Sequence, residues 1–436
     1  MNNQLFRARL HQKLFHLSSV ITTRFPRLGS AILDSILVPL VGNPLLAWHS
    51  RRHDLALLKN VRAFRRILVV ADIHIGDAIM MQAPISALRD FFPHAEIDYV
   101  IKKNVVSLIE GNPEISRIIP LYTGSRLAAD SDRQGVRDIT HGGAYDVCFN
   151  FHPFLDGSSL FPPDLTVVHF VNHAPVLVRN EFHPVAPNHF LYQAHRFVHE
   201  RLSPLFSLKR SEPLTGVAIR LSDAAVDEAA RFIRDAGIAT NAPRVLLNPD
   251  AASPYTRLPF EGHVELLSRL SALSVPILVA AGHTEANIGV RLKDALPAAQ
   301  QRDIHVVPST MSLDGWSALI DFADAFISAD TGPLHLGAAR KVSKSGSRTF
   351  RNRTAIHGVF GATPARMSGY DSSLPGFLPA NQDAPSHTYV AGSLCRNITC
   401  LNKLYKTCKT IRCFEALDLD VIGSTIRAEI AMSRHT

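Results

Sequence analysis

Two segments of the chain, residues 67–84 and 325–339, place an aspartate and a glycine soon after an apolar run. The first reads ILVVADIHIGDAIMMQAP and the second reads AFISADTGPLHLGAA. Each apolar run predicts a strand, and the residues after it predict the start of a helix, where backbone N–H groups lack intrahelical partners and the helix dipole is positive. Such a turn can bind phosphate groups. Two of them predict two nucleotide-type domains facing one cleft.

The second turn carries four residues suited to binding a diphosphate. Gly332 would let the backbone approach an anion, and the Thr331 hydroxyl and the first N–H groups of the helix would donate hydrogen bonds to it. Asp330 is expected to fix the turn or to contact sugar hydroxyls, because a carboxylate repels phosphate. His335 has two interpretations, a donor to phosphate or sugar and a buried histidine of the helix.

The first turn carries a carboxylate, Asp77. A carboxylate beside a bound ligand can act as a general base. The same residue could instead cap a helix that starts near Ala78, which is a common use of aspartate. Asp72 and His74 lie in the same turn and could orient Asp77 or contact an acceptor sugar.

Strand-like and helix-like segments alternate through both halves of the chain, which predicts parallel sheets with ligands at the carboxyl ends of the strands. The pattern weakens over residues 156–213, which fits either a variable acceptor-facing surface or irregular loops. No GxGxxG follows the first strand, which argues against a dinucleotide oxidoreductase. The expected strands are ILVV, AEIDYVI, RIIPL and YDVCFNF in the first half, and RVLLNPD, VPILVAA, HVVP and AFISA in the second.

Four motifs follow one another along the chain: the RRILVV–IGD opening unit, LLNPDAASPYTRLP, ISADTGPLHLGAA and VFGATPARMSGY. In this order they resemble the motifs of the lipopolysaccharide heptosyltransferase family, the inverting glycosyltransferases that use ADP-heptose. The resemblance covers roughly residues 65–430. It implies an α/β fold of GT-B type, with two Rossmann-like doubly wound domains. It also implies heptose transfer from ADP-heptose to a lipopolysaccharide core acceptor of inner-core type.

Three other functions remain open at this point. They are heptose transfer to a protein acceptor of the autotransporter kind, a non-catalytic nucleotide-sugar-binding protein that has kept the fold, and an epimerase on the same fold. The resemblance also implies residue roles. Asp77 would be the base, the Asp330–His335 turn would hold donor phosphates and sugar, and Glu285 would lie near the nucleoside, although a solvated Glu at a helix start fits equally. No cofactor is expected to be required.

The sequence departs from the family pattern at two places. Where the family usually has a Lys, this chain has Thr256, and Arg257 would have to replace the missing charge although its planar fork is not equivalent to an ammonium group. After LHLGAA the chain inserts a basic stretch, residues 340–354. This stretch would either grip acceptor phosphates or form a solvated loop. Its cationic residues are Arg340, Lys341, Lys344, Arg348, Arg351 and Arg353.

Length and composition predict a globular protein of two domains. The 436 residues exceed one ordinary core, and 46% are hydrophobic against 19% charged. The expected organisation is a basic, partly amphipathic helical extension at 1–64, an acceptor domain at 65–213, a crossing at 214–236 and a nucleotide-sugar domain with a Cys-rich tail at 237–436. No apolar run of membrane-spanning length and no signal peptide are recognised. A cytoplasmic protein is therefore expected.

Positive charge is concentrated at the start of the chain. Residues 1–66 hold eleven Lys or Arg and two acids, a net charge of +9 against +8 for the whole chain. This segment could lie on the anionic cytoplasmic face of the inner membrane, or pack on the first domain or on another subunit. No reader motif for nucleic acid accompanies the charge. Deletion of residues 1 to about 58 is expected to leave a folded catalytic body.

Four of the five cysteines form a C-x4-C-x7-C-x4-C cluster near the end of the chain: Cys395, Cys400, Cys408 and Cys413. This clustering in a cytosolic protein favours a metal over disulfides, yet the gaps are wider than the usual zinc spacing, and reduced structural thiols fit as well. By resemblance, the heptosyltransferases that modify autotransporters use four cysteines for iron. The fifth, Cys148, is expected in the core.

Overall fold

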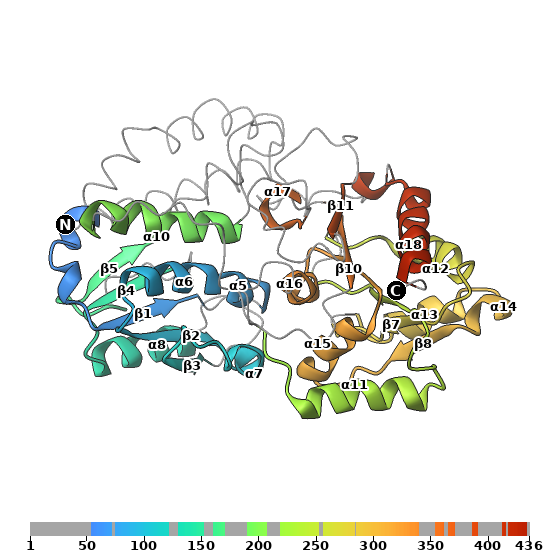
Figure 1. Cartoon of the computed structure of the whole chain (residues 1–436), viewed down its shortest axis with the longest axis horizontal. Coiled ribbons are helices and arrows are strands. Elements are labelled where there is room, and N and C mark those ends of the chain that lie inside the picture. Colours follow the sequence, from blue (N-terminus) through green and yellow to red (C-terminus); the bar gives the residue numbers. More distant parts are fainter. Residues whose placement is uncertain are drawn as a thin grey trace. The chain divides into compact units, whose positions relative to one another are not determined.

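The structure, a computed structural model, describes residues 54–71, 75–121, 130–151, 160–170, 190–206, 219–252, 256–283, 285–339, 354–361, 365–370, 386–390, 412–415 and 417–433. These residues fold as two compact units that divide between Ala218 and Ile219. We call them the N-terminal unit and the C-terminal unit (Figure 1).

The N-terminal unit is built on a five-stranded parallel sheet with the strand order β3-β2-β1-β4-β5. The chain adds β2 and β3 on one side of β1 and then returns to add β4 and β5 on the other side. The order of elements is β1 (Arg66–Val70), α5 (Ile75–Met80), α6 (Gln82–Phe91), β2 (Glu96–Lys102), α7 (Val106–Ile109), β3 (Arg117–Leu121), α8 (Asp130–Gly142), β4 (Val147–Asn150), β5 (Thr166–His169) and α10 (Phe190–Phe206).

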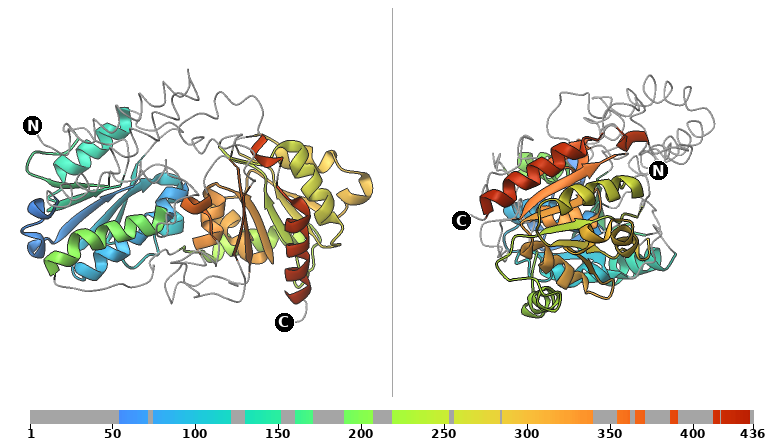
Figure 2. Two further views of the ribbon diagram at one scale, coloured as in Figure 1. Left: turned by 90° about the horizontal axis from the view of Figure 1, so that it is seen from above. Right: turned by 90° about the vertical axis from the view of Figure 1, so that its right-hand side faces the viewer.

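Helices cover both faces of this sheet, which explains why its central strand is apolar on both sides. Leu68 and Val70 of β1 pack in a cluster with Val136 of α8. Figures 1 and 2 show α8 on one face and the packed pair α6 and α10 on the other. Cys148 of β4 is fully buried, as the sequence predicts, and burial raises the pKa of its thiol.

The helix that the sequence predicts after β1 is divided into α5 and α6 at Met81. Pro84 is the reason, because it has no N–H to donate to the carbonyl of Met80 and its ring clashes there. The proline is instead accommodated in the first turn of α6. The short α5 is fixed separately, since the Tyr99 hydroxyl of β2 donates to the carbonyl of Ala78 at 2.8 Å.

The segment with the weak pattern, residues 156–213, includes two regular elements of the N-terminal unit, β5 and α10. The helix was expected from HRFVHERLSPLF and is confirmed. The strand TVVH was not expected, because a four-residue edge strand carries little periodicity.

A buried ion pair joins the start of the described chain to α10. Asp54 accepts from Arg201 Nε at 2.7 Å, and the two side chains are only 2% and 4% exposed. Leu58 and Val61 are buried nearby in the sequence. Residues 54–64, which the sequence analysis assigned to the extension, therefore fold with the N-terminal unit. A truncation that spares this unit has to stop before Asp54.

We expect Asp54→Asn to lower the free energy of unfolding by about 3–5 kcal/mol, because it removes the buried carboxylate that faces the Arg201 charge. Urea unfolding followed by circular dichroism measures the loss. Replacing both partners with apolar residues, Asp54→Leu with Arg201→Met, should recover most of it. Glu200→Gln, which changes an acid beside Arg201 whose side chain is 40% exposed, should cost less than about 1 kcal/mol. Equal effects of Asp54→Asn and Glu200→Gln would contradict this account.

The C-terminal unit contains a six-stranded parallel sheet in the order β11-β10-β9-β6-β7-β8. The order of elements is α11 (Asp223–Asp235), β6 (Val245–Asn248), α12 (Phe260–Ser271), β7 (Ile277–Ala280), α13 (Ile288–Asp294), α14 (Ala298–Gln301), β8 (Ile304–Val307), α15 (Leu313–Phe322), β9 (Ala325–Ala329), α16 (Gly332–Ala339), β10 (Ala355–Phe360), α17 (Ala365–Ser368), β11 (Ser386–Val390) and α18 (Leu419–Ser433).

Helices cover both faces of this sheet as well (Figure 2). One face packs against α12, α13 and α18 in a single apolar cluster. On the other face lie α15 and α16, and α11 packs on α15. The α11 helix falls within residues 214–236, which the sequence analysis assigned to a crossing. Its start is defined by Ser222, whose side chain accepts from the Ala225 N–H at 3.2 Å.

Each unit thus has the doubly wound α/β architecture predicted from the sequence. Among the described residues, no helix combines the length and the apolar character that crossing a membrane requires.

Candidate active site

The two middle strands of the C-terminal sheet, β6 and β9, lie side by side where the chain reverses direction across the sheet. From β6 the chain proceeds to β7 and β8 on one side, and β9 then begins the other side. In such sheets ligands bind beyond the carboxyl ends of the strands at this point. Asn248 ends β6 and is the register partner of Ser328 in β9. These two residues mark the centre of the candidate site.

A network of short polar side chains holds Thr331 at this position. The Asn248 amide nitrogen lies 3.1 Å from Ser328 Oγ, 3.3 Å from Thr331 Oγ1 and 3.1 Å from the carbonyl of Asp250. Ser328 Oγ and Thr331 Oγ1 are 3.1 Å apart. The hydroxyl predicted to contact phosphate is therefore oriented by groups from both strands. Nothing in the sequence indicated a role for Asn248, the last residue of β6, or for Ser328, the last but one of β9.

The α16 helix begins directly after Thr331. The carbonyl of Thr331 accepts from the Leu334 N–H at 3.0 Å, which closes the first turn. Pro333 fits this turn because its fixed backbone angle suits the start of a helix. The first N–H groups of a helix have no intrahelical acceptors and lie at the positive end of its dipole. The predicted anion-binding turn thus has the expected local structure.

His335 is buried inside this helix, with a side chain 6% exposed. Its Nδ1 lies 2.8 Å from the Tyr370 hydroxyl, and its Nε2 lies 3.5 Å from Asp330 Oδ1. Burial, with a further contribution from the Asp330 charge, raises the pKa of Tyr370, so its hydroxyl stays protonated. Of the two interpretations from the sequence, the contacts favour a buried histidine that holds Asp330. No sequence pattern pointed to a role for Tyr370.

A second cluster forms after β6 and β7 around Asp250, a residue that the sequence analysis did not select. Its carboxylate accepts from Arg257 Nη1 at 3.1 Å and from the His283 N–H at 2.7 Å. The Arg257 guanidinium also pairs with Glu285 through Nη2. Gly282 permits this turn, since its φ is +95° and an added Cβ would lie 2.4 Å from the Glu285 carbonyl.

The structure therefore brings Arg257 and Glu285 together, whereas the sequence analysis gave them separate ligand contacts. Glu285 also pairs with Arg291 through its other oxygen. The Arg257 charge is shared between two carboxylates, so it contributes less net positive potential than an isolated cation would. An acid directly after a strand, as in LLNPD, was the available signal for Asp250.

In the N-terminal unit, Asp77 lies in the first turn of α5, just beyond the carboxyl end of β1. Here too the chain changes direction across the sheet, because β2 lies on one side of β1 and β4 lies on the other. Val70 at the end of β1 is the register partner of Asn150 in β4. The helix starts at Ile75, so Asp77 is not the N-cap of a helix starting near Ala78, and that interpretation is wrong. Asp77 is partly exposed, and the dipole of a helix start favours its anion.

Several predicted residues lie outside the described part of the chain. These are Asp72, His74, three of the clustered cysteines (Cys395, Cys400 and Cys408) and the basic stretch at residues 340–353. Their roles stay predictions. Cys413 is described and packs partly buried against the apolar cluster of the C-terminal unit.

Comparison with solved structures identifies the fold. The ADP-heptose LPS heptosyltransferase II of E. coli aligns with a TM-score of 0.57 and 15% identity, covering 85% of this chain and 99% of that chain. A family 9 glycosyl transferase from Veillonella parvula DSM 2008 aligns with a TM-score of 0.60 and 18% identity, covering 84% of this chain and 98% of that chain. The predicted GT-B class of α/β fold is confirmed. Comparison with curated protein sequences gives no match.

Residues 200–343 match the sequence profile of glycosyltransferase family 9 (heptosyltransferase). The matched segment includes Asn248, Arg257, Glu285 and the turn from Asp330 to His335, and it does not reach Asp77. This match places residues 200–343 in glycosyltransferase family 9, and it confirms the predictions of a chain related to the heptosyltransferases and of a glycosyltransferase enzyme.

Proposed function

We propose that this protein transfers heptose from ADP-heptose to a lipopolysaccharide core acceptor, with inversion at the anomeric carbon. The main support is the polar network of Asn248, Ser328 and Thr331 at the reversal point of the C-terminal sheet, inside the segment that matches family 9. The donor and the acceptor class follow the name of the structurally similar E. coli enzyme, an ADP-heptose LPS heptosyltransferase.

On the donor side, the Thr331 hydroxyl and the first N–H groups of α16 donate hydrogen bonds to the diphosphate. Negative charge grows on the diphosphate as the bond to the anomeric carbon breaks, so these donors stabilise the transition state more than the bound donor. Asn248 and Ser328 contribute by holding the hydroxyl in one orientation, which avoids the cost of reorganising it during the reaction.

On the acceptor side, Asp77 accepts the proton of the attacking hydroxyl. As the acceptor oxygen forms its bond to the anomeric carbon, the proton moves to the carboxylate, and the bonding electrons of the leaving group stay with ADP. The position of Asp77 in the first turn of α5 keeps its anion favoured before the acceptor binds.

The experiment that tests this function measures ADP release in a coupled assay. The purified enzyme is given ADP-heptose or another nucleotide sugar, with and without an acceptor. We expect ADP to be released only when both ADP-heptose and a heptose-deficient lipopolysaccharide are present. ADP release that requires a protein acceptor instead would indicate protein modification, the alternative left open by the sequence. No acceptor-dependent release with any donor would contradict the proposal.

Donor binding and transfer are expected to need no divalent metal, because helix N–H groups and hydroxyls supply the contacts to the diphosphate. Chelator-treated enzyme, assayed well below its unfolding temperature, should keep its rate within about twofold of the untreated enzyme. Loss of activity that only magnesium or manganese restores would show that this description of the phosphate site is wrong.

A further inference from the structure

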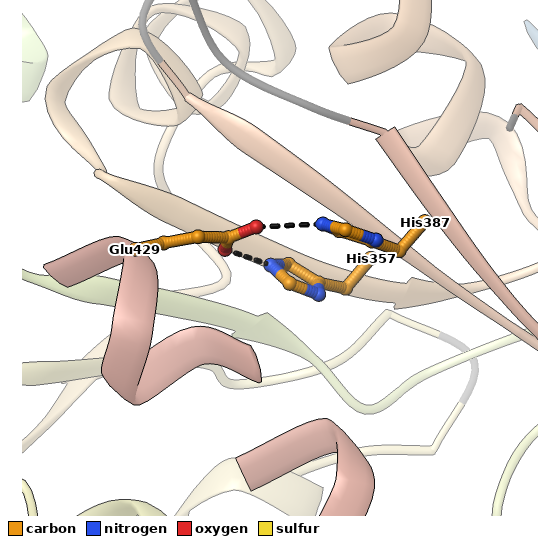
Figure 3. Close-up of side chains that lie close together, drawn as sticks. All are labelled: His357, His387 and Glu429. Carbon is orange, nitrogen blue, oxygen red and sulfur yellow. Dashed lines mark hydrogen bonds and ion pairs between the residues drawn. The ribbon is translucent and has the colours of Figure 1, made fainter. Parts of the chain in front are cut away.

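Two histidines of the C-terminal sheet lie side by side on the face covered by α18. His357 of β10 and His387 of β11 are register partners, and their rings stack with centroids 5.0 Å apart. Val359, two residues after His357, belongs to the apolar cluster that also contains α18 residues. Side chains two residues apart in a strand share a face, so both histidines point toward α18. Figure 3 shows this arrangement.

The α18 helix places a carboxylate between these rings. Its apolar stripe, formed by Ile422, Ile426 and Ile430, packs in the core, and Glu429 lies beside this stripe. Glu429 Oε2 is 2.8 Å from His357 Nε2, and Oε1 is 2.6 Å from His387 Nε2 (Figure 3). The Glu429 side chain is 8% exposed and that of His357 is fully buried. Burying a carboxylate costs free energy unless it is paired and hydrogen-bonded, and the two imidazole nitrogens supply the partners of Glu429.

These three side chains form a ligand set suited to a divalent transition metal. One ligand atom from each residue lies within 4.8 Å of the others. Imidazole nitrogen and carboxylate oxygen bind zinc at about 2.0–2.2 Å, which separates tetrahedral ligands by about 3.3 Å. The present contacts of 2.8 and 2.6 Å would have to widen by about 0.5 and about 0.7 Å. His387, whose side chain is 32% exposed, is free enough of the core to make that adjustment.

A neighbouring tyrosine holds one of the two histidine rings in place. The Tyr389 hydroxyl lies 3.0 Å from His357 Nδ1, a contact that orients the ring from behind as outer groups do around metal ligands.

We propose that His357, His387 and Glu429 bind a divalent transition metal of the zinc type, which ties α18 to strands β10 and β11. Water supplies the remaining coordination from the exposed side of His387. The site belongs to the C-terminal unit alone and uses none of the residues proposed for donor binding. Its expected role is to stabilise the fold, because the metal binds ligands that come together only in the folded chain.

The test uses the full chain without a polyhistidine tag, stripped with a chelator and titrated with zinc by calorimetry. We expect one zinc ion to bind with these ligands. A free zinc concentration of about a hundred times the dissociation constant should raise the unfolding midpoint by about 5–10 °C. Cobalt should give the visible absorption of a nitrogen- and oxygen-ligated site, without a sulfur charge-transfer band.

His387→Gln provides the decisive variant, because its amide can still donate to Glu429 and hold α18, but binds metal poorly. We expect zinc affinity to fall by more than about 100-fold while the metal-free unfolding midpoint changes little. His305→Gln, on the edge strand β8 at the other end of the sheet, is the matched control and should leave zinc affinity unchanged.

Two outcomes would overturn the proposal. Unchanged zinc affinity in His387→Gln would assign the metal to another site. The same conclusion would follow if the cobalt spectrum showed a sulfur charge-transfer band that disappeared when the four clustered cysteines were replaced with serine. Absence of zinc binding by the stripped wild-type chain would show that the three residues form only a hydrogen-bonded bridge.

Discussion

Asp77→Asn should lower kcat by about 10²–10⁴-fold, the usual contribution of a positioned general base. The amide keeps the size of the side chain and its place in the first turn of α5, but it cannot accept the proton of the acceptor hydroxyl. ADP affinity should stay within about twofold, because in our proposal the nucleotide is held by the C-terminal unit. The measurements are kcat from acceptor-dependent ADP release and the ADP dissociation constant from calorimetry.

Asp138→Asn is the matched control for this prediction, since Asp138 is an exposed acid of α8 in the same unit. It should leave both quantities unchanged. If Asp77→Asn turned over at a nearly normal rate, Asp77 would not be the base. If it bound ADP poorly and also unfolded early, its role would be structural.

Thr331→Val should lower kcat by about 10²–10³-fold, the cost of removing one hydrogen-bond donor from a preorganised anion site. Valine keeps the shape of threonine and replaces its hydroxyl with a methyl group. The local fold should persist, because the Asn248 amide keeps the Ser328 hydroxyl and the Asp250 carbonyl as acceptors. Steady-state kinetics with saturating acceptor separate this loss from a loss of donor binding.

Thr331→Ser is the matched variant, because it keeps the hydroxyl and removes one methyl group. It should retain most of the wild-type rate, while Thr331→Val does not. A near-normal rate for Thr331→Val would show that the hydroxyl does not contact the diphosphate.

The sequence was informative where function depends on local structure. The turn from Asp330 to His335 could be recognised because an apolar strand, a glycine and a helix follow one another within fifteen residues. The Cys148 strand and its neighbours could be recognised because parallel strands buried on both faces are nearly continuous apolar runs. The division of α5 from α6 could also have been predicted from Pro84, since a proline opposes an unbroken helix.

The sequence was uninformative where function depends on residues far apart in the chain. Asp250, Arg257 and Glu285 form one cluster only because β6 and β7 end beside each other. The separate ligand contacts expected of Arg257 and Glu285 could therefore not be checked from spacing. His357 and His387 meet through the register of β10 and β11, and Glu429 of α18, 42 residues after His387, joins them. No local pattern encodes such a juxtaposition.

The central claim is an inverting transfer of heptose, and the product tests it most directly. Wild-type enzyme is incubated with ADP-heptose of known anomeric configuration and a heptose-deficient lipopolysaccharide, and the product is examined by mass spectrometry and nuclear magnetic resonance. Our account predicts an acceptor that carries one additional heptose, with the anomeric configuration opposite to that of the donor. An unmodified acceptor, free heptose from hydrolysis alone, or a product with retained configuration would contradict it.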